Sequence, residues 1–184
     1  VGVRPIWVCG GITQGDTYVR TSRVHGVGAG KGGGNRGVHG AKAGGKIVGL
    51  NEKEYTFSGG QVVISDDNGI ESIAGVMGGL ATGCTEETTD VFLEAAYWDH
   101  IQIAMTGRAL KINSDARYRN ERGIDPAYNM QAMEDATAMI MELCGGEPSN
   151  VTVAGKAPDV SRAYKLDAKR VQSLGGMDMS LIHT

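Results

Sequence analysis

The sequence predicts an α+β fold, in which mixed or antiparallel sheets with hairpins pack against a few helices. Between residues 46 and 98, short apolar runs are separated by polar turns, as in strands that are joined by hairpins. Helical periodicity begins only after Asp99, so strands and helices do not alternate as they do in regular βαβ units. Aromatic residues make up only 5% of the chain, so Val, Ile, Leu, Met and Ala must build most of the core.

The composition limits the partners that the chain can have. Its 184 residues are enough for one domain, or for one domain and part of a second. A net charge of -3 gives no general attraction for nucleic acid, so any RNA contact must be local, and we expect no DNA partner. Three widely spaced cysteines, without zinc-finger spacing to histidine, indicate a reduced cytoplasmic chain without a metal site.

The sequence also predicts whether the chain enters a membrane and how it divides into domains. No apolar run is long enough to cross a membrane, and the first residues lack the apolar core of a signal peptide, so we expect no membrane partner. The chain opens at Val1 rather than at Met and ends in a weakly patterned tail, as expected for a piece of a longer polypeptide. We assign residues 1–157 to one domain and residues 158–184 to a linker or to the start of the following domain.

Residues 1–45 are rich in glycine and follow neither a strand period nor a helix period. Half of the twenty residues from Gly26 to Gly45 are glycine, which predicts loop or weak strand. Glycines at 28, 30 and 33 have the spacing of a dinucleotide-binding fingerprint, which requires a preceding strand and a helix that starts within the motif. More glycines and Arg36 follow instead, so we expect no ATP binding here.

The strands are expected in the middle of the chain. Asn68 and Gly69 lie between two apolar runs and give the strongest short-range hairpin signal, because both residues tolerate positive φ. We place this turn at residues 66–69. The expected strand segments are KIVGL (46–50), EYTF (54–57), QVVIS (61–65), the return strand IESIAGVMGG (70–79), TDVFLEAAYW (89–98) and NVTVAG (150–155).

Two helices are expected after these strands. The first covers about residues 100–111, with Asp99 as its N-cap. The second covers residues 126–144, with Asp125 as its N-cap, proline at its first position and two glycines after its end. Because methionine fills irregular gaps, we interpret the methionines of the second helix as core residues. The residues expected along one face are Met130, Met133, Thr137, Ile140, Met141 and Cys144.

Three motifs indicate a pocket, although each also has a purely structural interpretation. Glu94 lies in an apolar frame, either as a surface residue at the end of a strand or as a group that recognises a hydroxyl in a small-molecule pocket. Glycines at 75, 78 and 79 form either a tight turn or a pocket wall without Cβ atoms. Residues 108–126 mix arginines and acidic residues, as in a solvated ion-pair loop, but Ser114 and Ala116 are also suited to line a site for a small polar group.

Together and in this order, the motifs resemble the editing region of the beta subunit of bacterial phenylalanyl-tRNA synthetase. The resemblance is dense from about Lys46 to Gly155, which is more than half of the chain, and looser over residues 1–45. The matching strings are VVISDDNGIESIAGVMGG, TTDVFLEAAYWD, TGRALKINSDARYR, ERGIDPA and a helix that ends in ELCGG.

This resemblance implies an editing reaction, the hydrolysis of tyrosine mischarged onto tRNA-Phe, because a pocket for phenylalanine does not exclude an extra hydroxyl strongly enough. Glu94 falls on the glutamate that hydrogen-bonds the tyrosine phenol in that family. Ser114 and Ala116 fall on residues that line the pocket, with serine in place of threonine, and Gly78 falls on a glycine of the pocket wall. These four are the expected substrate-binding residues.

The resemblance also implies catalytic residues and partners. His25 and Arg4 fall on the histidine and arginine near the ester and the tRNA terminus, and water is the implied nucleophile. The whole synthetase is implied to charge tRNA-Phe as an α₂β₂ assembly with ATP and Mg²⁺, so its partners are the tRNA and the alpha subunit. Within these 184 residues we expect no cofactor and no metal.

The chain departs from the family pattern mainly in its first third. Glycine stands at 28, 30 and 45 where the family has acidic residues, Trp7 replaces an asparagine, and Asn120 replaces an aromatic residue. We therefore expect His25 to contribute less than its family counterpart, and complete loss of tyrosyl-tRNA deacylation in His25→Ala would contradict this. The alternative function is a catalytically degenerate structural or tRNA-docking module of the same family.

Overall fold

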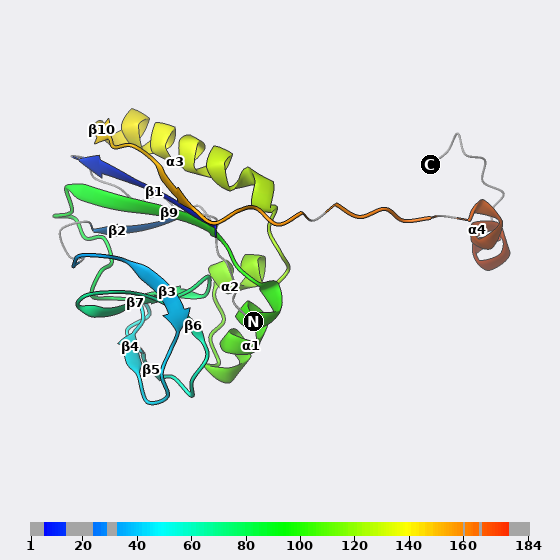
Figure 1. Ribbon diagram of the computed structural model, residues 1–184, viewed down its shortest axis with the longest axis horizontal. Helices are drawn as coiled ribbons and strands as arrows, with labels where there is room; N and C mark the ends of the chain where they lie inside the picture. The colour runs from blue at the N-terminus through cyan, green and yellow to red at the C-terminus, as the bar shows by residue number, and fades with distance from the viewer. Residues whose placement is uncertain (1–5, 14–23, 29–32, 160, 166, 177–184) are drawn as a thin grey trace.

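The computed structural model describes residues 6–13, 24–28, 33–159, 161–165 and 167–176, and within them it confirms an α+β fold. Figure 1 shows two sheets, one above the other, with helix α3 on the outer face of the upper sheet and helices α1 and α2 beside the lower one. The described helices are α1 (His100–Ala109), α2 (Asp115–Asn120), α3 (Asn129–Cys144) and α4 (Ala168–Gly175), with a 3₁₀ turn at Pro126–Tyr128.

The two main sheets are antiparallel and are built from different parts of the chain. In the first sheet the strand order is β10-β1-β9-β2, and β11 also pairs with β1; in the second it is β3-β6-β7-β8. The strands of the first sheet are β1 (Ile6–Thr13), β2 (Val24–Gly28), β9 (Asp90–Tyr97), β10 (Glu147–Pro148) and β11 (Thr152–Ala154). The other strands are β3 (Gly37–Gly40), β6 (Val62–Asp66), β7 (Gly69–Ile73), β8 (Met77–Gly78) and a separate pair, β4 (Lys46–Val48) and β5 (Glu54–Thr56).

The glycine-rich first third contains more strand than its sequence predicts. β1 pairs with β9 over eight residues, from Ile6 opposite Tyr97 to Thr13 opposite Asp90, and β2 pairs with the other edge of β9. These strands form because β9 supplies backbone partners on both sides, a tertiary effect that local propensity does not report. The described part of the glycine motif is followed by strand β3.

The hairpin at residues 66–69 is confirmed, but its geometry differs from the expectation. Asp66 pairs with Gly69, so Asp67 and Asn68 are the central residues of the turn. Of these four residues only Gly69 has positive φ, at 136°. Asp66 Oδ1 accepts hydrogen bonds from the backbone N–H groups of Asn68 (2.8 Å) and Gly69 (3.1 Å), and this side-chain turn replaces the expected pair of positive φ angles. The return strand also divides into β7 and β8, which form a second hairpin.

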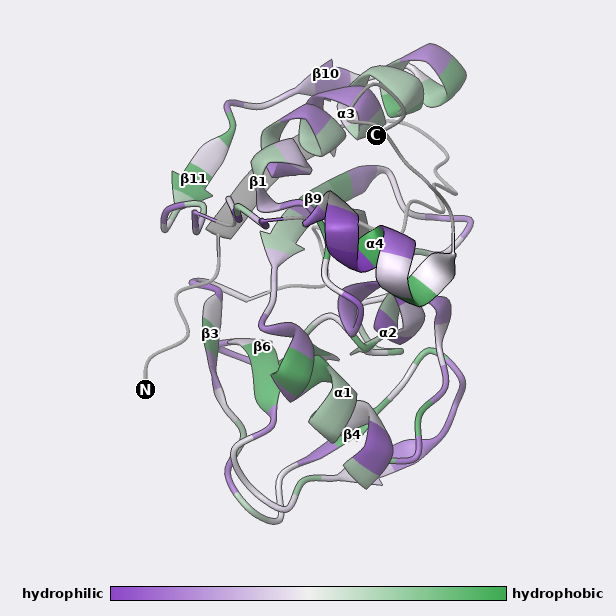
Figure 2. Ribbon diagram, turned by 90° about the vertical axis from the view of Figure 1, so that its right-hand side faces the viewer, coloured by the Kyte–Doolittle hydropathy of each residue, from purple (hydrophilic) through white to green (hydrophobic). Residues whose placement is uncertain are grey.

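Strand β9 separates two hydrophobic cores because successive side chains point to opposite faces of the sheet. Val91, Leu93 and Ala95 pack with residues of α3 in one core. Ala96, together with Trp98 just after the strand, belongs to the other core, which contains Ile73 and other residues of the second sheet. Figure 2 shows α3 and β9 on one side of the molecule and β6 with α1 on the other, where β6 is coloured as hydrophobic. The space between the two sheets is therefore lined by one face of β9.

Both predicted helices are present, but the buried face of the second differs from the prediction. Asp99 caps α1 by accepting a hydrogen bond from the Gln102 N–H at 2.9 Å, and Asp125 caps the 3₁₀ turn that leads into α3. In α3 the expected core residues Met130 and Met141 are 41% and 39% exposed. The residues of α3 that are buried are Asn129, Ala132, Met133, Ala136 and Ile140. Small alanines, rather than a row of methionines, allow this helix to lie close to β9.

The last part of the described chain is exposed. Figure 1 shows an extended segment after β11 that leads to α4, which stands apart from the sheets and is capped by Asp167. The proposed domain boundary at residue 157 lies in this segment and stays a prediction. Among the described residues, no helix is long and apolar enough to cross a membrane.

Candidate functional site

Glu94 lies in the middle of β9, on the face that looks toward the second sheet. Only 8% of the residue is exposed, although it carries a carboxyl group. Among the described residues, no hydrogen bond is formed to this carboxyl group. Burial raises the pKa of Glu94 from 4.5 to about 8; the negative charge of Glu71 adds to this shift, and the positive charge of Arg36 opposes it. At neutral pH the carboxyl group is therefore mostly protonated.

Arg36 and Glu71 form a buried ion pair beside Glu94. Arg36 Nε donates to Glu71 Oε2 at 2.8 Å, and Arg36 Nη2 donates to Glu71 Oε1 at 3.1 Å. The side chains of Arg36 and Glu71 are 15% and 4% exposed. The guanidinium group also lies over the ring of Phe92, 4.1 Å from its centroid, and Phe92 shares the face of β9 with Glu94. Arg36 thus connects the second sheet to the first at the position of Glu94.

Glu71 and Arg36 were not among the site residues expected from the sequence. A signal was present, since Glu71 lies within the apolar run IESI in the same way that Glu94 lies within its own apolar run. Arg36 gave no signal of its own, because it follows a run of glycines whose structure the sequence left open. Only the packing of the two sheets brings Arg36, Glu71 and Phe92 together.

The glycines at the end of β8 allow close backbone approach to Glu71. The Gly79 N–H donates to the Glu71 carbonyl oxygen at 2.8 Å, and a Cβ atom at Gly79 would lie 2.3 Å from that oxygen. Gly78, the predicted wall residue, is half-buried and pairs with Ser72. The tight-turn interpretation holds for Gly75, which lies between β7 and β8 with φ of 65°.

Ser114 and Ala116 lie at the start of α2, which is attached to the turn between β7 and β8. The Ser114 hydroxyl donates to the Val76 carbonyl oxygen at 2.5 Å and accepts from the Arg117 N–H at 3.1 Å. Ala116 is half-buried in the first turn of α2. Asn120, at the end of the helix, donates to the Gly75 carbonyl oxygen at 3.0 Å. Helix α2 is therefore attached at both of its ends to the turn between β7 and β8.

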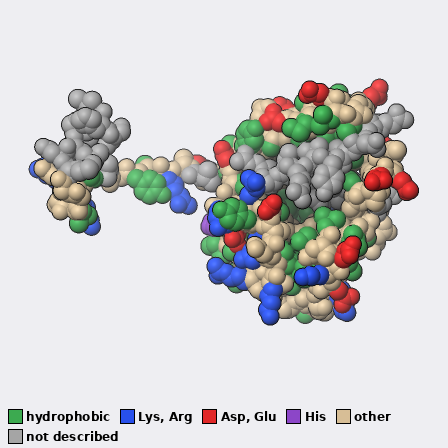
Figure 3. All heavy atoms as spheres, turned by 180° about the vertical axis from the view of Figure 1, so that it is seen from behind, with side chains coloured by type: hydrophobic (Ala, Val, Ile, Leu, Met, Phe, Trp, Pro, Cys, Tyr) green, Lys and Arg blue, Asp and Glu red, His purple; other side chains and the backbone are tan. Residues whose placement is uncertain are grey.

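The arginine-rich loop around α2 partly fits its structural interpretation. Arg117 Nε pairs with Glu121 at 2.9 Å, and Arg117 Nη1 donates to the Ile112 carbonyl oxygen at 2.6 Å. Arg122 pairs with Glu121 at 3.2 Å. Figure 3 shows acidic and basic side chains interspersed over one face of the molecule, in keeping with the low net charge. These ion pairs stabilise the loop that carries Ser114 and Ala116.

Contacts of the second sheet lie near three of the four predicted substrate-binding residues, Glu94, Gly78 and Ser114. Glu94 interacts electrostatically with Glu71, the neighbouring Ser72 pairs with Gly78, and Val76 between β7 and β8 accepts the hydrogen bond from Ser114. Within the described part of the chain, no hydrogen bond or ion pair joins Glu94 directly to Ser114 or Ala116. The convergence of all four residues in one cavity stays a prediction.

The structure describes only part of the two predicted catalytic residues, His25 and Arg4. In the first sheet, Glu94 pairs with His25 of β2 on one side and with Cys9 of β1 on the other. The backbone of His25 therefore lies beside that of Glu94. The side chain of His25 and the whole of Arg4 lie outside the described residues. Their catalytic roles therefore stay predictions.

Other features of the described surface lie away from these residues. A hollow of about 300 Å³ beside α3 and β10 contains none of the predicted site residues, and its lining includes Met133, Thr137, Met141, Pro148 and Val151. In the same described ranges, no group of three or more His, Cys, Asp or Glu side chains is placed to hold a metal ion.

Comparison with known proteins gives matches over nearly the whole chain. The model of a family described as the B3/4 domain matches residues 24–145. The phenylalanine–tRNA ligase beta subunit of Ruegeria pomeroyi is 60% identical over 179 residues, which are 97% of this chain and 22% of that protein. The corresponding subunit of Cereibacter sphaeroides is 53% identical over the same shares of the two chains.

A solved structure is also similar. It is the crystal structure of an N-terminal fragment of the phenylalanyl-tRNA synthetase beta subunit from Pyrococcus horikoshii, with a TM-score of 0.49 and 13% identity over 95% of this chain and 57% of that chain. The chain spans about a fifth of the length of the curated relatives that it matches. The resemblance to phenylalanyl-tRNA synthetase beta subunits is confirmed by the relatives, and the family model covers well over half of the residues. The chain belongs to the B3/4 domain family.

Proposed function

We propose that this chain is the editing domain of a phenylalanine–tRNA ligase beta subunit and that it hydrolyses tyrosine mischarged onto tRNA-Phe. The observation that carries the proposal is the buried carboxyl group of Glu94, which has no hydrogen-bond partner among the described residues. A ligand that covers this carboxyl group without bonding to it would leave the group unsatisfied, at a cost of about 1 to 3 kcal/mol. A ligand with a polar atom at this position avoids that cost.

The phenol group of tyrosine is suited to that position. A protonated Glu94 can donate a hydrogen bond to the phenol oxygen, and its carbonyl oxygen can accept a hydrogen bond from the phenol O–H group. Phenylalanine offers neither atom, so it leaves the carboxyl group unsatisfied. A difference of about 1.4 to 2.8 kcal/mol corresponds to roughly ten- to a hundredfold in binding, and sites built to bind a hydroxyl reject analogues that lack it.

The proposed reaction is hydrolysis of the ester between tyrosine and the terminal ribose. Water attacks the ester carbonyl carbon and a new C–O bond forms. The bond to the ribose oxygen then breaks, and this oxygen takes up a proton, which leaves free tyrosine and uncharged tRNA. We assign the pocket lining to Gly78, Ser114 and Ala116 and the surroundings of the ester to His25 and Arg4, on the family resemblance. The bond from Ser114 to Val76 supports a role of Ser114 in fixing the wall of the pocket.

The remaining activity is proposed for the whole protein and not for this chain. The named relatives are beta subunits of phenylalanine–tRNA ligase, of which the chain covers about a fifth. We infer that the complete subunit works with an alpha subunit in the cytoplasm and charges tRNA-Phe with phenylalanine, using ATP and Mg²⁺. The present residues are assigned no part in that charging reaction.

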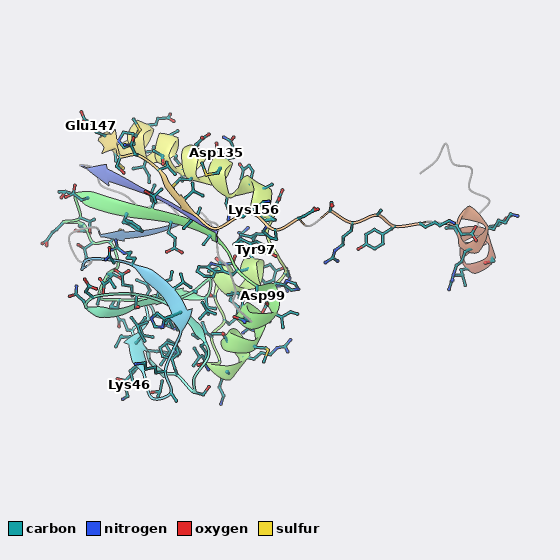
Figure 4. The ribbon with its side chains drawn as sticks, in the orientation of Figure 1. Lys46, Tyr97, Asp99, Asp135, Glu147 and Lys156 are labelled. Carbon is teal, nitrogen blue, oxygen red and sulfur yellow. The ribbon has the colours of Figure 1, made fainter. Side chains whose placement is uncertain are left out.

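Release of tyrosine from tyrosyl-tRNA-Phe tests the proposal. The chain should release tyrosine, and it should leave phenylalanyl-tRNA-Phe largely intact. Glu94→Ala should reduce the release by at least tenfold, because the phenol loses its partner. Glu54→Ala is the matched control, since Glu54 forms an exposed ion pair with Lys46, which Figure 4 places at the end of the molecule away from α3. No release by the unmodified chain would refute the editing function and favour the docking module.

A further inference from the structure

Arg36 and Glu71 take no part in the proposed reaction, yet they form a buried ion pair, with side chains that are 15% and 4% exposed. Its two hydrogen bonds, of 2.8 and 3.1 Å, match the fork of a guanidinium group to both oxygens of one carboxylate. The guanidinium carbon also lies over the Phe92 ring of β9, 4.1 Å from the ring centroid. The pair is therefore held in one geometry by three residues from two sheets.

Two carboxyl groups compete for one cation at this position. Glu71 and Arg36 are the charged groups of the described residues that act on Glu94. Glu71 has the guanidinium group to itself, and Glu94 forms no hydrogen bond to it. The strands beside β9 contribute the register partners Cys9 and His25, whose side chains lie outside the description.

We propose that Arg36 and Glu71 are positioning residues for Glu94: by occupying the guanidinium group, Glu71 keeps the Glu94 carboxyl group available for the hydroxyl of the substrate. This inference rests on the proposed function. Without Glu71, Arg36 would lose its carboxylate partner. Glu94 is a remaining carboxyl group on which the charge of Arg36 already acts, and Asp66, which hydrogen-bonds Glu71, is a second one. A Glu94 carboxylate bound by the guanidinium fork has its oxygens occupied, so a phenol would have to break an ion pair in order to bind.

The state of Glu94 can be measured without any substrate. A protonated carboxyl group has its own infrared C=O stretching band, and subtracting the spectrum of the same chain with Glu94→Gln isolates the band of Glu94. At pH 7 the unmodified chain should show this band, because burial and the charge of Glu71 raise the pKa of Glu94 to about 8. In Glu71→Gln the band should disappear at pH 7, since the freed guanidinium group now stabilises the carboxylate.

A double variant separates positioning from a merely structural role. In Arg36→Met with Glu71→Gln, no cation remains to capture Glu94, so its infrared band should return. For release of tyrosine from tyrosyl-tRNA-Phe, Glu71→Gln should raise KM roughly tenfold with a smaller change in kcat, and the double variant should recover most of that loss. If the pair only held the sheets together, the double variant would be at least as impaired as Glu71→Gln.

Each result decides the inference. Persistence of the Glu94 band in Glu71→Gln, or a double variant that recovers neither the band nor KM, would overturn it. Glu54→Gln removes the exposed ion pair with Lys46 and should change neither readout. If the infrared bands change as described but the unmodified chain releases no tyrosine, the arrangement around Glu94 is supported and the editing function fails.

Discussion

The Ser114 hydroxyl binds the carbonyl oxygen of Val76 at 2.5 Å and so attaches the start of helix α2 to the turn between β7 and β8. The Ser114 hydroxyl oxygen also caps the helix by accepting a hydrogen bond from the Arg117 N–H. One side chain therefore satisfies a free helix N–H group and joins two segments that are 38 residues apart. This explains why a hydroxyl residue is suited to a position that the family resemblance assigns to the pocket lining.

Replacement of Ser114 tests both bonds. Ser114→Ala should lower the free energy of unfolding by about 1 to 3 kcal/mol, since the cap and the bond to Val76 are lost together. Ser114→Thr keeps the hydroxyl and should stay within about 0.5 kcal/mol of the unmodified chain. Urea denaturation at one pH measures both values. Equal losses in the two variants would show that the hydroxyl is not what holds α2 in place.

The raised pKa of Glu94 predicts how stability depends on pH. In the folded chain the Glu94 carboxyl group keeps its proton up to about pH 8. In the unfolded chain, with its ordinary pKa of 4.5, the same group loses the proton at lower pH. The folded state therefore binds more protons between these values, and the free energy of unfolding falls as pH rises through this window, by up to about 1.4 kcal/mol per pH unit.

Glu94→Gln removes this titration, so its stability should change less steeply than that of the unmodified chain between pH 5 and pH 8. Denaturation at several pH values within the window measures the difference. Parallel pH profiles of the two proteins would mean that Glu94 is already ionised at the lower pH in the folded state.

Gly75 is predicted to tolerate no larger residue. Its φ is 65°, and a Cβ atom would lie 2.7 Å from Trp98 Cδ1 and 2.8 Å from Ile103 Cδ1. Gly75→Ala should cost about 2 to 4 kcal/mol of unfolding free energy, from the left-handed backbone and the overpacked core together. Gly123→Ala is the control, because its φ is 85° but no atom lies within 4 Å of the added Cβ. The control should cost only about 1 to 2 kcal/mol, and an equal cost at both sites would refute the packing argument.

The buried face of α3 is tested by two neighbouring residues. Ile140 is fully buried against β9, whereas Met141 is 39% exposed. Ile140→Ala should lower the free energy of unfolding by about 2 to 5 kcal/mol, and Met141→Ala by less than about 1 kcal/mol. Thermal or urea denaturation distinguishes them. A larger loss for Met141→Ala would restore the methionine face that the sequence suggested.

The elements that the sequence predicted are those with local signals. Asp99 and Asp125 cap their helical turns as expected, because capping depends on residues within one turn. The hairpin at residues 66–69 is present for the same reason. The prediction that Asn68 and Gly69 are its central residues was wrong, because Asp66 accepts hydrogen bonds from the backbone and so stabilises a different turn. The sequence pattern does not distinguish this turn from one with two positive φ angles.

The strands that the sequence missed depend on distant partners, whereas the short helix α2, also missed, is capped locally by Ser114. β1 and β2 have little strand propensity of their own and form against the two edges of β9. Glu94 was identifiable because a carboxyl group in an apolar run conflicts with the cost of burial. Arg36 and Glu71 were not, because their relation to Glu94 exists only when residues 35 positions apart meet between the sheets.

One face of strand β9 packs in the core with α3, and the other face lines the space between the sheets. A misaligned β9 would exchange these two faces. A slip of one residue against β1 and β2 would turn Glu94 toward α3 and bring Leu93 or Ala95 to face Arg36. Such a chain would bury a carboxyl group among alanines and would separate Glu94 from Arg36 and Glu71. If Glu94 binds the substrate hydroxyl as proposed, one strand alignment therefore decides both the packing of the core and the choice of substrate.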